Sequence, residues 1–183
     1  MTRPTQLSLT GTGTGPTIAA DFSADLRHRY RLECRWGPGP ALPWAMCNPS
    51  LAGSEAYRDN LDPTLRRCRS FTEAAGLRAF VVVNVFAVID PDPSVLRGET
   101  PEAPTEQEVD AIRWAVDLAN AEGCPGLVCA WGAHPRAVAR AQVLMPELRR
   151  AERLLCLRQT GAGHPGHPLY LPGRLRLVPW GEG

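Results

Sequence analysis

One apolar run constrains the fold of this chain more than any other feature. Residues 80–86 read FVVVNVF, a stretch rich in β-branched side chains. A strand with one face in water alternates apolar and polar residues, whereas a continuous run of this kind is typical of a strand covered on both faces. We therefore expect a buried strand here, with further layers of structure packed on both sides of its sheet.

Three shorter apolar runs complete the pattern, and signals for helix starts separate them. Buried strands are expected near residues 42–47, 80–86, 127–131 and 154–158. Asp62-Pro63 places a capping side chain before a proline at the first helical position. Thr105 and Glu108 form a capping box, and Pro135 opens a third helix that is expected to end near Leu144. Alternating strands and helices predict a three-layer α/β/α fold with a mostly parallel, four-stranded central sheet.

The length of 183 residues suits one compact domain. Residues 1–26 are rich in threonine and glycine and lack periodicity, so we expect a flexible N-terminal arm followed by a single α/β domain over residues 27–183. Residues 30–34 alternate like an edge strand of that domain.

Composition narrows the functional classes. The chain has 20 basic and 19 acidic residues, a net charge of +1, which disfavours a protein that holds long nucleic acid mainly by charge. Every basic residue is an arginine, so Schiff-base chemistry by lysine is excluded.

The cysteines and the hydropathy of the chain predict a cytoplasmic protein. There are six cysteines without a C-x-x-C pair, so we expect reduced, structural thiols, no metal site and no cofactor. We expect no signal peptide, and since no apolar run reaches the ~20 residues that span a bilayer, we expect no membrane association.

Polar residues follow the ends of the expected strands, where ligands bind in sheets of this class. Asn48 follows the first strand, Asn84 lies in the second, Trp131 ends the third, and His167 lies in the loop after the fourth. We expect these four residues to line one pocket. Each also has a simpler reading: Asn48 can shape a turn and Asn84 can bond neighbouring backbone. Likewise, His134 and Asp62 can act only as helix caps.

The order of these motifs resembles known proteins. Over about residues 29–171 the chain is similar to a bacterial family of unknown function, through Asn48-Pro49-Ser50, Asp62-Pro63-Thr64, Asn84-Val85-Phe86, Trp131-Gly132 and His167-Pro168-Leu169-Tyr170. Shorter motifs at Asn48, Asn84, Trp131 and His167 resemble the four site motifs of the uracil-DNA glycosylase superfamily. The resemblance implies a uracil-DNA glycosylase-like fold.

The resemblance also implies roles for single residues. Asn48 would position the attacking water. Asp62 lies in a motif of the family of unknown function that the glycosylases lack, and we expect it as the alternative residue that aids the water attack. Asn84 would read the edge of a pyrimidine, because an amide offers a donor and an acceptor together. His167 would stabilise the anionic leaving base. Arg66 and Arg67, early in a helix, could hold a phosphate or carboxylate.

The remaining expected substrate-binding residues are Pro49, Ser50, Phe86, Trp131 and Gly132. The sequence also departs from the glycosylase pattern. No aromatic residue follows the first motif closely, which leaves Tyr57 or Phe86 as the stacking residue. The fourth motif reads His-Pro-Leu-Tyr, so the loop that would wedge into duplex DNA is altered.

These features lead to one functional hypothesis and two alternatives. We expect a glycosylase-like enzyme, a hydrolase of the N-glycosidic bond of a nucleotide, nucleoside or nucleic-acid base. The alternatives are a non-catalytic nucleobase-binding protein and a modified-nucleoside enzyme of different chemistry on the same scaffold. The expected partner is a small nucleobase-containing ligand or single-stranded nucleic acid. The sequence leaves the oligomeric state open.

Overall fold

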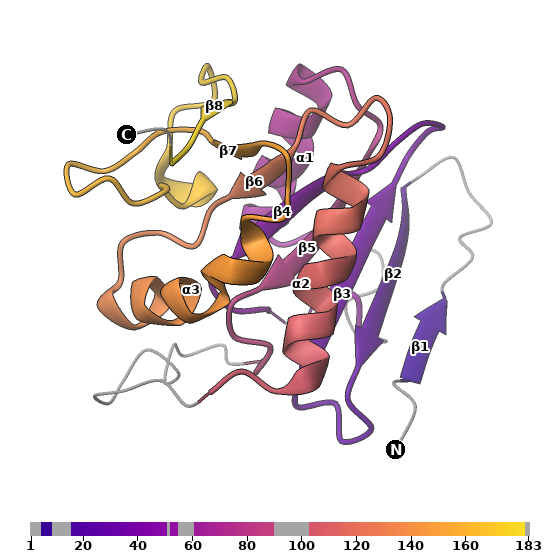
Figure 1. Ribbon diagram of the computed structural model, residues 1–183. Helices are drawn as coiled ribbons and strands as arrows, with labels where there is room; N and C mark the ends of the chain where they lie inside the picture. The colour runs from indigo at the N-terminus through magenta and orange to yellow at the C-terminus, as the bar shows by residue number, and fades with distance from the viewer. Residues whose placement is uncertain (1–4, 9–15, 51, 55–60, 90–102, 182–183) are drawn as a thin grey trace.

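The computed structural model describes residues 5–8, 16–50, 52–54, 61–89 and 103–181. These residues form an α/β fold in which helices cover both faces of one mixed sheet (Figure 1). The strands are β1 (Thr5–Ser8), β2 (Thr17–Phe22), β3 (Arg29–Arg35), β4 (Leu42–Met46), β5 (Ala79–Asn84), β6 (Leu127–Cys129), β7 (Leu154–Cys156) and β8 (Val178–Pro179). The helices are α1 (Pro63–Ala74), α2 (Glu106–Ala119), α3 (Pro135–Leu148) and the 3-10 turn η3 (Pro168–Tyr170).

The four strands expected from the sequence form the parallel core of the sheet. The strand order is β1-β2-β3-β5-β4-β6-β7-β8. Strand β4 pairs in parallel with β5 on one side and β6 on the other, and β6 pairs in parallel with β7. The sheet has more strands than the four expected. Strands β3, β2 and β1 extend one edge in antiparallel order, and β8 extends the other.

The N-terminal segment is the main correction to the expected domain layout. Residues 1–26 were expected to form a flexible arm, but β2 lies within them and pairs along β3. Ile18, Ala20 and Phe22 on β2 are buried in the core, with at most 3% exposed. Alternate residues of β2 are apolar and supply the buried face of a strand, a short period-two pattern that the surrounding glycines and threonines mask. Residues 1–4 and 9–15 of the expected arm lie outside the described residues.

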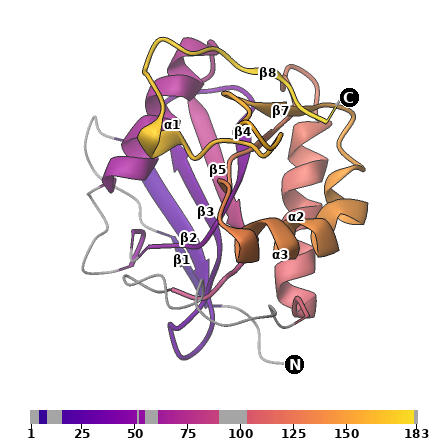
Figure 2. The ribbon, with the colours of Figure 1, turned by 90° about the vertical axis from the view of Figure 1, so that its left-hand side faces the viewer.

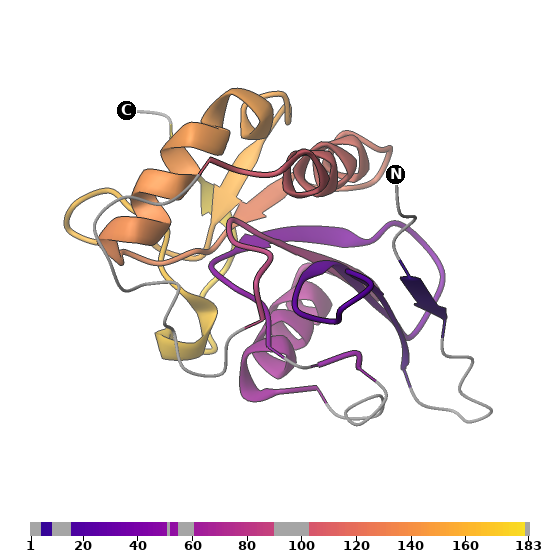
Figure 3. The same ribbon diagram turned by 90° about the horizontal axis from the view of Figure 1, so that it is seen from below.

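The helices lie on opposite faces of the sheet (Figures 2 and 3). Side chains alternate along a strand, so each strand contributes to both layers. Trp44 of β4 and Val82 of β5 pack with α1 in one apolar cluster, whereas Ala45 and Val83 pack with α2 and α3 in another. The continuous apolar run of β5 is buried along its whole length, as the sequence predicts.

The signals for helix starts are confirmed. Asp62 caps α1, the Thr105–Glu108 capping box begins α2, and His134 caps α3. Helix α3 runs through Pro146 to Leu148, beyond its expected end.

A buried ion pair fixes the chain beyond β5. Glu108 on α2 and Arg140 on α3 are 6% and 4% exposed and approach to 3.2 Å. A Glu108 carboxylate oxygen accepts a hydrogen bond from the Ala87 amide at 2.9 Å, and Arg140 Nε donates to the Val85 carbonyl oxygen at 2.9 Å. The two helices thereby hold the segment that follows Asn84, the last residue of β5.

Candidate functional site

A cavity of about 740 Å³ opens at the carboxyl ends of the parallel strands. Its position fits the rule that ligands of open α/β sheets bind outside these strand ends. The four residues expected to share a pocket, Asn48, Asn84, Trp131 and His167, all line it. Ser50, Asp62 and Gly132 also line it, as expected for site residues.

Asn84 lies deep in this cavity with an unsatisfied amide. It is the last residue of β5 and is 5% exposed. Its Oδ1 is buried and has no hydrogen-bond partner among the described residues. The β4–β5 pairing continues past it, since the Val85 amide donates to the Met46 carbonyl oxygen at 2.8 Å. A buried acceptor without a partner is costly, and its place in the cavity lets a ligand donor satisfy it.

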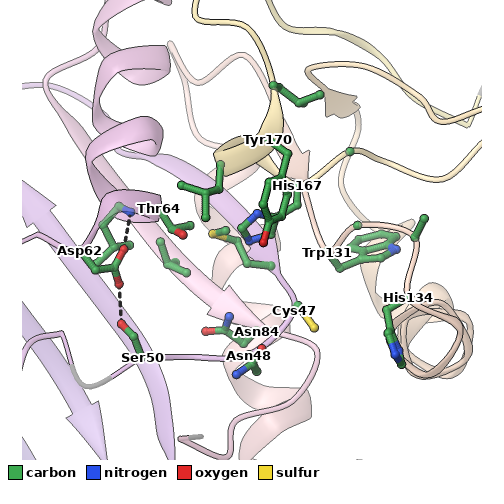
Figure 4. Close-up of a pocket in the computed structure, with 18 of the residues that line it drawn as sticks. Cys47, Asn48, Ser50, Asp62, Thr64, Asn84, Trp131, His134, His167 and Tyr170 are labelled. Atoms are coloured by element: carbon green, nitrogen blue, oxygen red, sulfur yellow. Dashed lines mark hydrogen bonds between the residues drawn. The ribbon is translucent and has the colours of Figure 1, made fainter. Parts of the chain in front are cut away.

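His167 lines the same cavity just before η3. Burial lowers its pKa from 6.5 to about 4, although the negative charge of Asp62 opposes the shift. The imidazole is therefore neutral at pH 7 and carries a single N–H. Its Nδ1 is buried and, within the described part of the chain, has no hydrogen-bond partner. Figure 4 shows His167 above Asn84 and Asn48, so polar groups from the end of β5 and from two loops face one space.

Gly132 joins the loop bearing His167 to the end of β6 through a backbone hydrogen bond. Its amide donates to the Pro165 carbonyl oxygen at 3.0 Å. Its φ of +82° is rarely adopted by other residues, and a Cβ added there would lie 3.5 Å from His167 Cβ. The Trp-Gly motif therefore positions the histidine loop.

Asp62 supplies a carboxylate to the cavity wall. One oxygen accepts the Leu65 amide at 2.8 Å and so caps α1, while the other accepts the Ser50 hydroxyl at 2.5 Å. Both contacts are drawn in Figure 4. The simpler reading of Asp62 as a helix cap is correct, and the same side chain also lines the cavity.

Arg29 is a lining residue that the sequence reasoning missed. It is 2% exposed, and its Nη1 donates to the carbonyl oxygens of Ser50 at 3.2 Å and Ala52 at 2.9 Å. Burial lowers its pKa to about 10, and the nearby charge of Asp62 opposes this shift. It begins β3, which reads as an ordinary alternating edge strand, so no sequence signal marked it.

Trp131 and His134 form the opposite wall (Figure 4). Trp131 is 3% exposed, and its ring meets that of Trp180 edge-on, with centroids 5.1 Å apart. His134 caps α3, because its Nδ1 accepts the Arg136 amide at 3.3 Å. The expected alternative for His134 as a helix cap is thus correct, and its side chain also reaches the cavity rim.

Tyr170 at the rim was not among the expected site residues. It lines the cavity and is 80% exposed. Its ring lies beside that of His167, with centroids 5.6 Å apart. The His-Pro-Leu-Tyr motif, read from the sequence as a departure from the glycosylase pattern, contained the signal for this residue.

Several expected binding residues lie outside the cavity lining. Pro49 is buried beside it, and Phe86 is buried beneath the guanidinium of Arg140, at 4.9 Å from its ring centroid. Arg66 Nε donates to the Leu61 carbonyl oxygen at 2.7 Å. Arg67 bonds to the carbonyl oxygens of Pro168 and Leu171. The two arginines therefore stabilise the protein instead of lining the site, and Tyr57 lies outside the described residues.

Other classes of site leave no trace in the described part of the structure. All six cysteines are free and buried, and burial raises the pKa of the Cys47 thiol, in the cavity wall, to about 12. Among the described residues, no group of three or more histidine, cysteine, aspartate or glutamate side chains could hold a metal ion. None of the helices described is both long and apolar enough to cross a membrane.

Comparison with known proteins places the chain in a family. The model of a family described as protein of unknown function, DUF1643, matches residues 29–169. The chain belongs to the DUF1643 family. The matched region begins at Arg29 and includes Asn48, Asp62, Asn84 and His167, so the DUF1643 region carries most of the cavity. No curated protein and no solved structure matches the chain.

Proposed function

We propose that the chain is a glycosylase-like enzyme that hydrolyses the N-glycosidic bond of a nucleotide, nucleoside or nucleic-acid base. We further propose that its fold is related to that of the uracil-DNA glycosylase superfamily. The order of the site motifs along the parallel strands supports this relationship, since Asn84 ends β5 and Asn48, Trp131 and His167 follow β4, β6 and β7.

One observation carries the proposal. Asn84 Oδ1 and His167 Nδ1, which line one cavity, are both buried and without hydrogen-bond partners among the described residues. Buried polar atoms are rarely left unpaired in folded proteins, and a ligand in the cavity would satisfy both of these. A planar ring with carbonyl and N–H groups on its edge complements an amide and a neutral imidazole. Pyrimidine bases carry such an edge.

The reaction follows from the charges of the lining groups. Water would attack the anomeric carbon of the sugar, the carbon–nitrogen bond would break, and its electron pair would leave with the base. Asp62, the only carboxylate among the described lining residues, would accept the proton of the water. The neutral imidazole of His167 would donate its N–H to the oxygen on which the leaving base develops negative charge. Protonation of the base would complete the reaction.

A nucleobase-binding protein without catalysis is the second candidate. Both carboxylate oxygens of Asp62 already accept hydrogen bonds from the protein, which weakens a proton acceptor. Asn48, at the place of the water-positioning residue, is a neutral amide and cannot take up a proton.

Asp62→Asn separates the two candidates, because asparagine still caps a helix but lacks the charge. Release of free base from nucleosides, nucleotides and short single strands would be measured by chromatography, with binding measured in parallel by calorimetry. We expect the wild type to release base and the variant to release it roughly a hundredfold more slowly, with similar binding. Binding without release by the wild type would support the second candidate.

A further inference from the structure

The charges in the cavity wall point to one more feature of the ligand. We infer that the cavity takes a nucleobase compound bearing a phosphate, with Arg158 contacting the phosphate and Arg29 attracting it from behind the wall. This inference rests on the proposed function, since it extends the ligand from a base to a nucleoside phosphate or a nucleotide within a strand.

Positive charge exceeds negative charge among the described lining residues. Arg29 and Arg158 carry guanidinium groups, and Asp62 supplies the only carboxylate. The Asp62 oxygens accept hydrogen bonds from Ser50 and Leu65, and no ion pair joins Asp62 to either arginine. An anionic ligand would balance this charge.

Arg29 is a buried cation whose guanidinium group is only partly satisfied by hydrogen bonds and has no ion-pair partner among the described residues. Its Nη1 is held by the carbonyl oxygens of Ser50 and Ala52. Its Nε is buried without a hydrogen-bond partner, and no described carboxylate forms an ion pair with it. A buried charge without an ion-pair partner is costly, and a ligand anion near Arg29 would offset that cost. Because Nε is inaccessible, Arg29 would act on a ligand through its charge.

Arg158 is placed for direct contact. It follows β7, its side chain is exposed, and it lines the cavity. Its carbonyl oxygen accepts the Gly166 amide at 2.8 Å, which fixes its backbone next to the loop carrying His167. Its guanidinium bonds to none of the described residues, so its donors are available to phosphate oxygens.

This assignment replaces the arginines expected from the sequence. Arg66 and Arg67 bond to backbone carbonyl oxygens outside the cavity lining. Phosphate is the anionic group that nucleobase compounds carry, and it is present both in a free nucleotide and in single-stranded nucleic acid. The shared chemistry is therefore a phosphate attached to the sugar of the bound base.

The test compares a free base, its nucleoside, its nucleoside monophosphates and a trinucleotide by calorimetry. We expect phosphate-bearing ligands to bind the wild type about tenfold or more tightly than the nucleoside, the effect of one charge-assisted hydrogen bond. Arg158→Gln should reduce this ratio to near one. Arg174→Gln is the matched control, because Arg174 is exposed and outside the cavity lining.

Arg29→Lys and Arg29→Met test the buried charge. Arg29→Met removes the positive charge and should lower the ratio of nucleotide to nucleoside affinity. Arg29→Lys keeps the charge and should preserve more of that ratio. If Arg29 had only a structural role, its replacement would weaken the binding of nucleotide and nucleoside equally and leave the ratio of their affinities unchanged. Tightest binding of a monophosphate would identify a free nucleotide as the source, and tightest binding of the trinucleotide would identify a strand.

The result that overturns this inference is distinct from failure of the proposed function. Nucleoside binding that a phosphate does not strengthen, or an Arg158→Gln variant with the wild-type ratio, would contradict the phosphate subsite alone. Failure of every base, nucleoside and nucleotide to bind would contradict the proposed function itself.

Discussion

The guanidinium of Arg67 on α1 donates a hydrogen bond to the carbonyl oxygen of Leu171, a residue 104 positions later in the chain. The same side chain reaches the Pro168 carbonyl oxygen at 3.5 Å and lies 4.8 Å from the ring centroid of Phe71. These contacts fasten η3, and with it His167, to the helix whose N-cap is Asp62. Arg67 thus supports the site without lining its cavity.

Replacement of Arg67 should therefore affect both stability and binding. We expect Arg67→Met to lower the free energy of unfolding by about 1–3 kcal/mol, because two carbonyl oxygens lose a charged donor. Ligand affinity should fall as well, since the loop carrying His167 is released. Chemical denaturation and calorimetry would measure the two effects.

The matched control for this variant is Arg69→Met. Arg69 lies on the same helix and forms an exposed pair with Glu73 at 2.9 Å, which contributes about 1 kcal/mol or less. Equal effects of the two variants on ligand affinity would contradict the positioning role of Arg67.

The buried pair of Glu108 and Arg140 predicts a larger stability loss. Glu108→Ala removes the carboxylate that pairs with the buried guanidinium of Arg140 and the acceptor of the Ala87 amide. We expect the free energy of unfolding to fall by about 3–5 kcal/mol in urea denaturation. Glu73→Ala, which breaks an exposed pair, should cost far less, and similar losses in both variants would show that the buried pair has no special role.

His167 predicts a dependence of stability on pH. Its pKa is lowered from 6.5 to about 4 in the folded protein, so the unfolded chain binds the proton more readily in this range. Stability from this group is present above pH 6.5 and is lost as the pH falls towards 4, by roughly 3 kcal/mol. Replacement by Gln should make the decline of stability over this range shallower than in the wild type. The free energy of unfolding would be measured by urea denaturation at several pH values. The same pH dependence in the Gln variant and the wild type would argue against a neutral, buried imidazole.

The sequence predicted the centre of the fold but not its edges. The four apolar runs became β5, β4, β6 and β7, since strands buried on both faces have few alternatives. The capping residues Asp62 and Thr105 marked their helices correctly, because capping depends on local chemistry. Strand β2 was not predicted, because its pairing with β3 depends on tertiary contacts, and its short sequence of apolar and polar residues gives only a weak strand signal.

The residues of the candidate site likewise divide into those that the sequence could predict and those that it could not. Four residues could be predicted to meet because each ends or follows a parallel strand: Asn48, Asn84, Trp131 and His167. The positions of the Arg66 and Arg67 side chains could not be predicted, since both donate hydrogen bonds to backbone carbonyl oxygens, of Leu61 and of the chain around η3. Arg29 gains its position only when β3 packs beside the strand ends, a long-range relationship that local sequence does not encode.

The release of free base by the wild type, Asn84→Ala and His167→Ala tests the central claim most directly. Each enzyme would be incubated with nucleotides and short single strands, base release would be measured, and thermal unfolding would confirm that each variant is folded. We predict release by the wild type and a loss of about a hundred- to thousandfold in both variants, the usual effect of removing one hydrogen bond to a developing charge. Undiminished release in both folded variants would contradict the proposal that Asn84 and His167 hold the base.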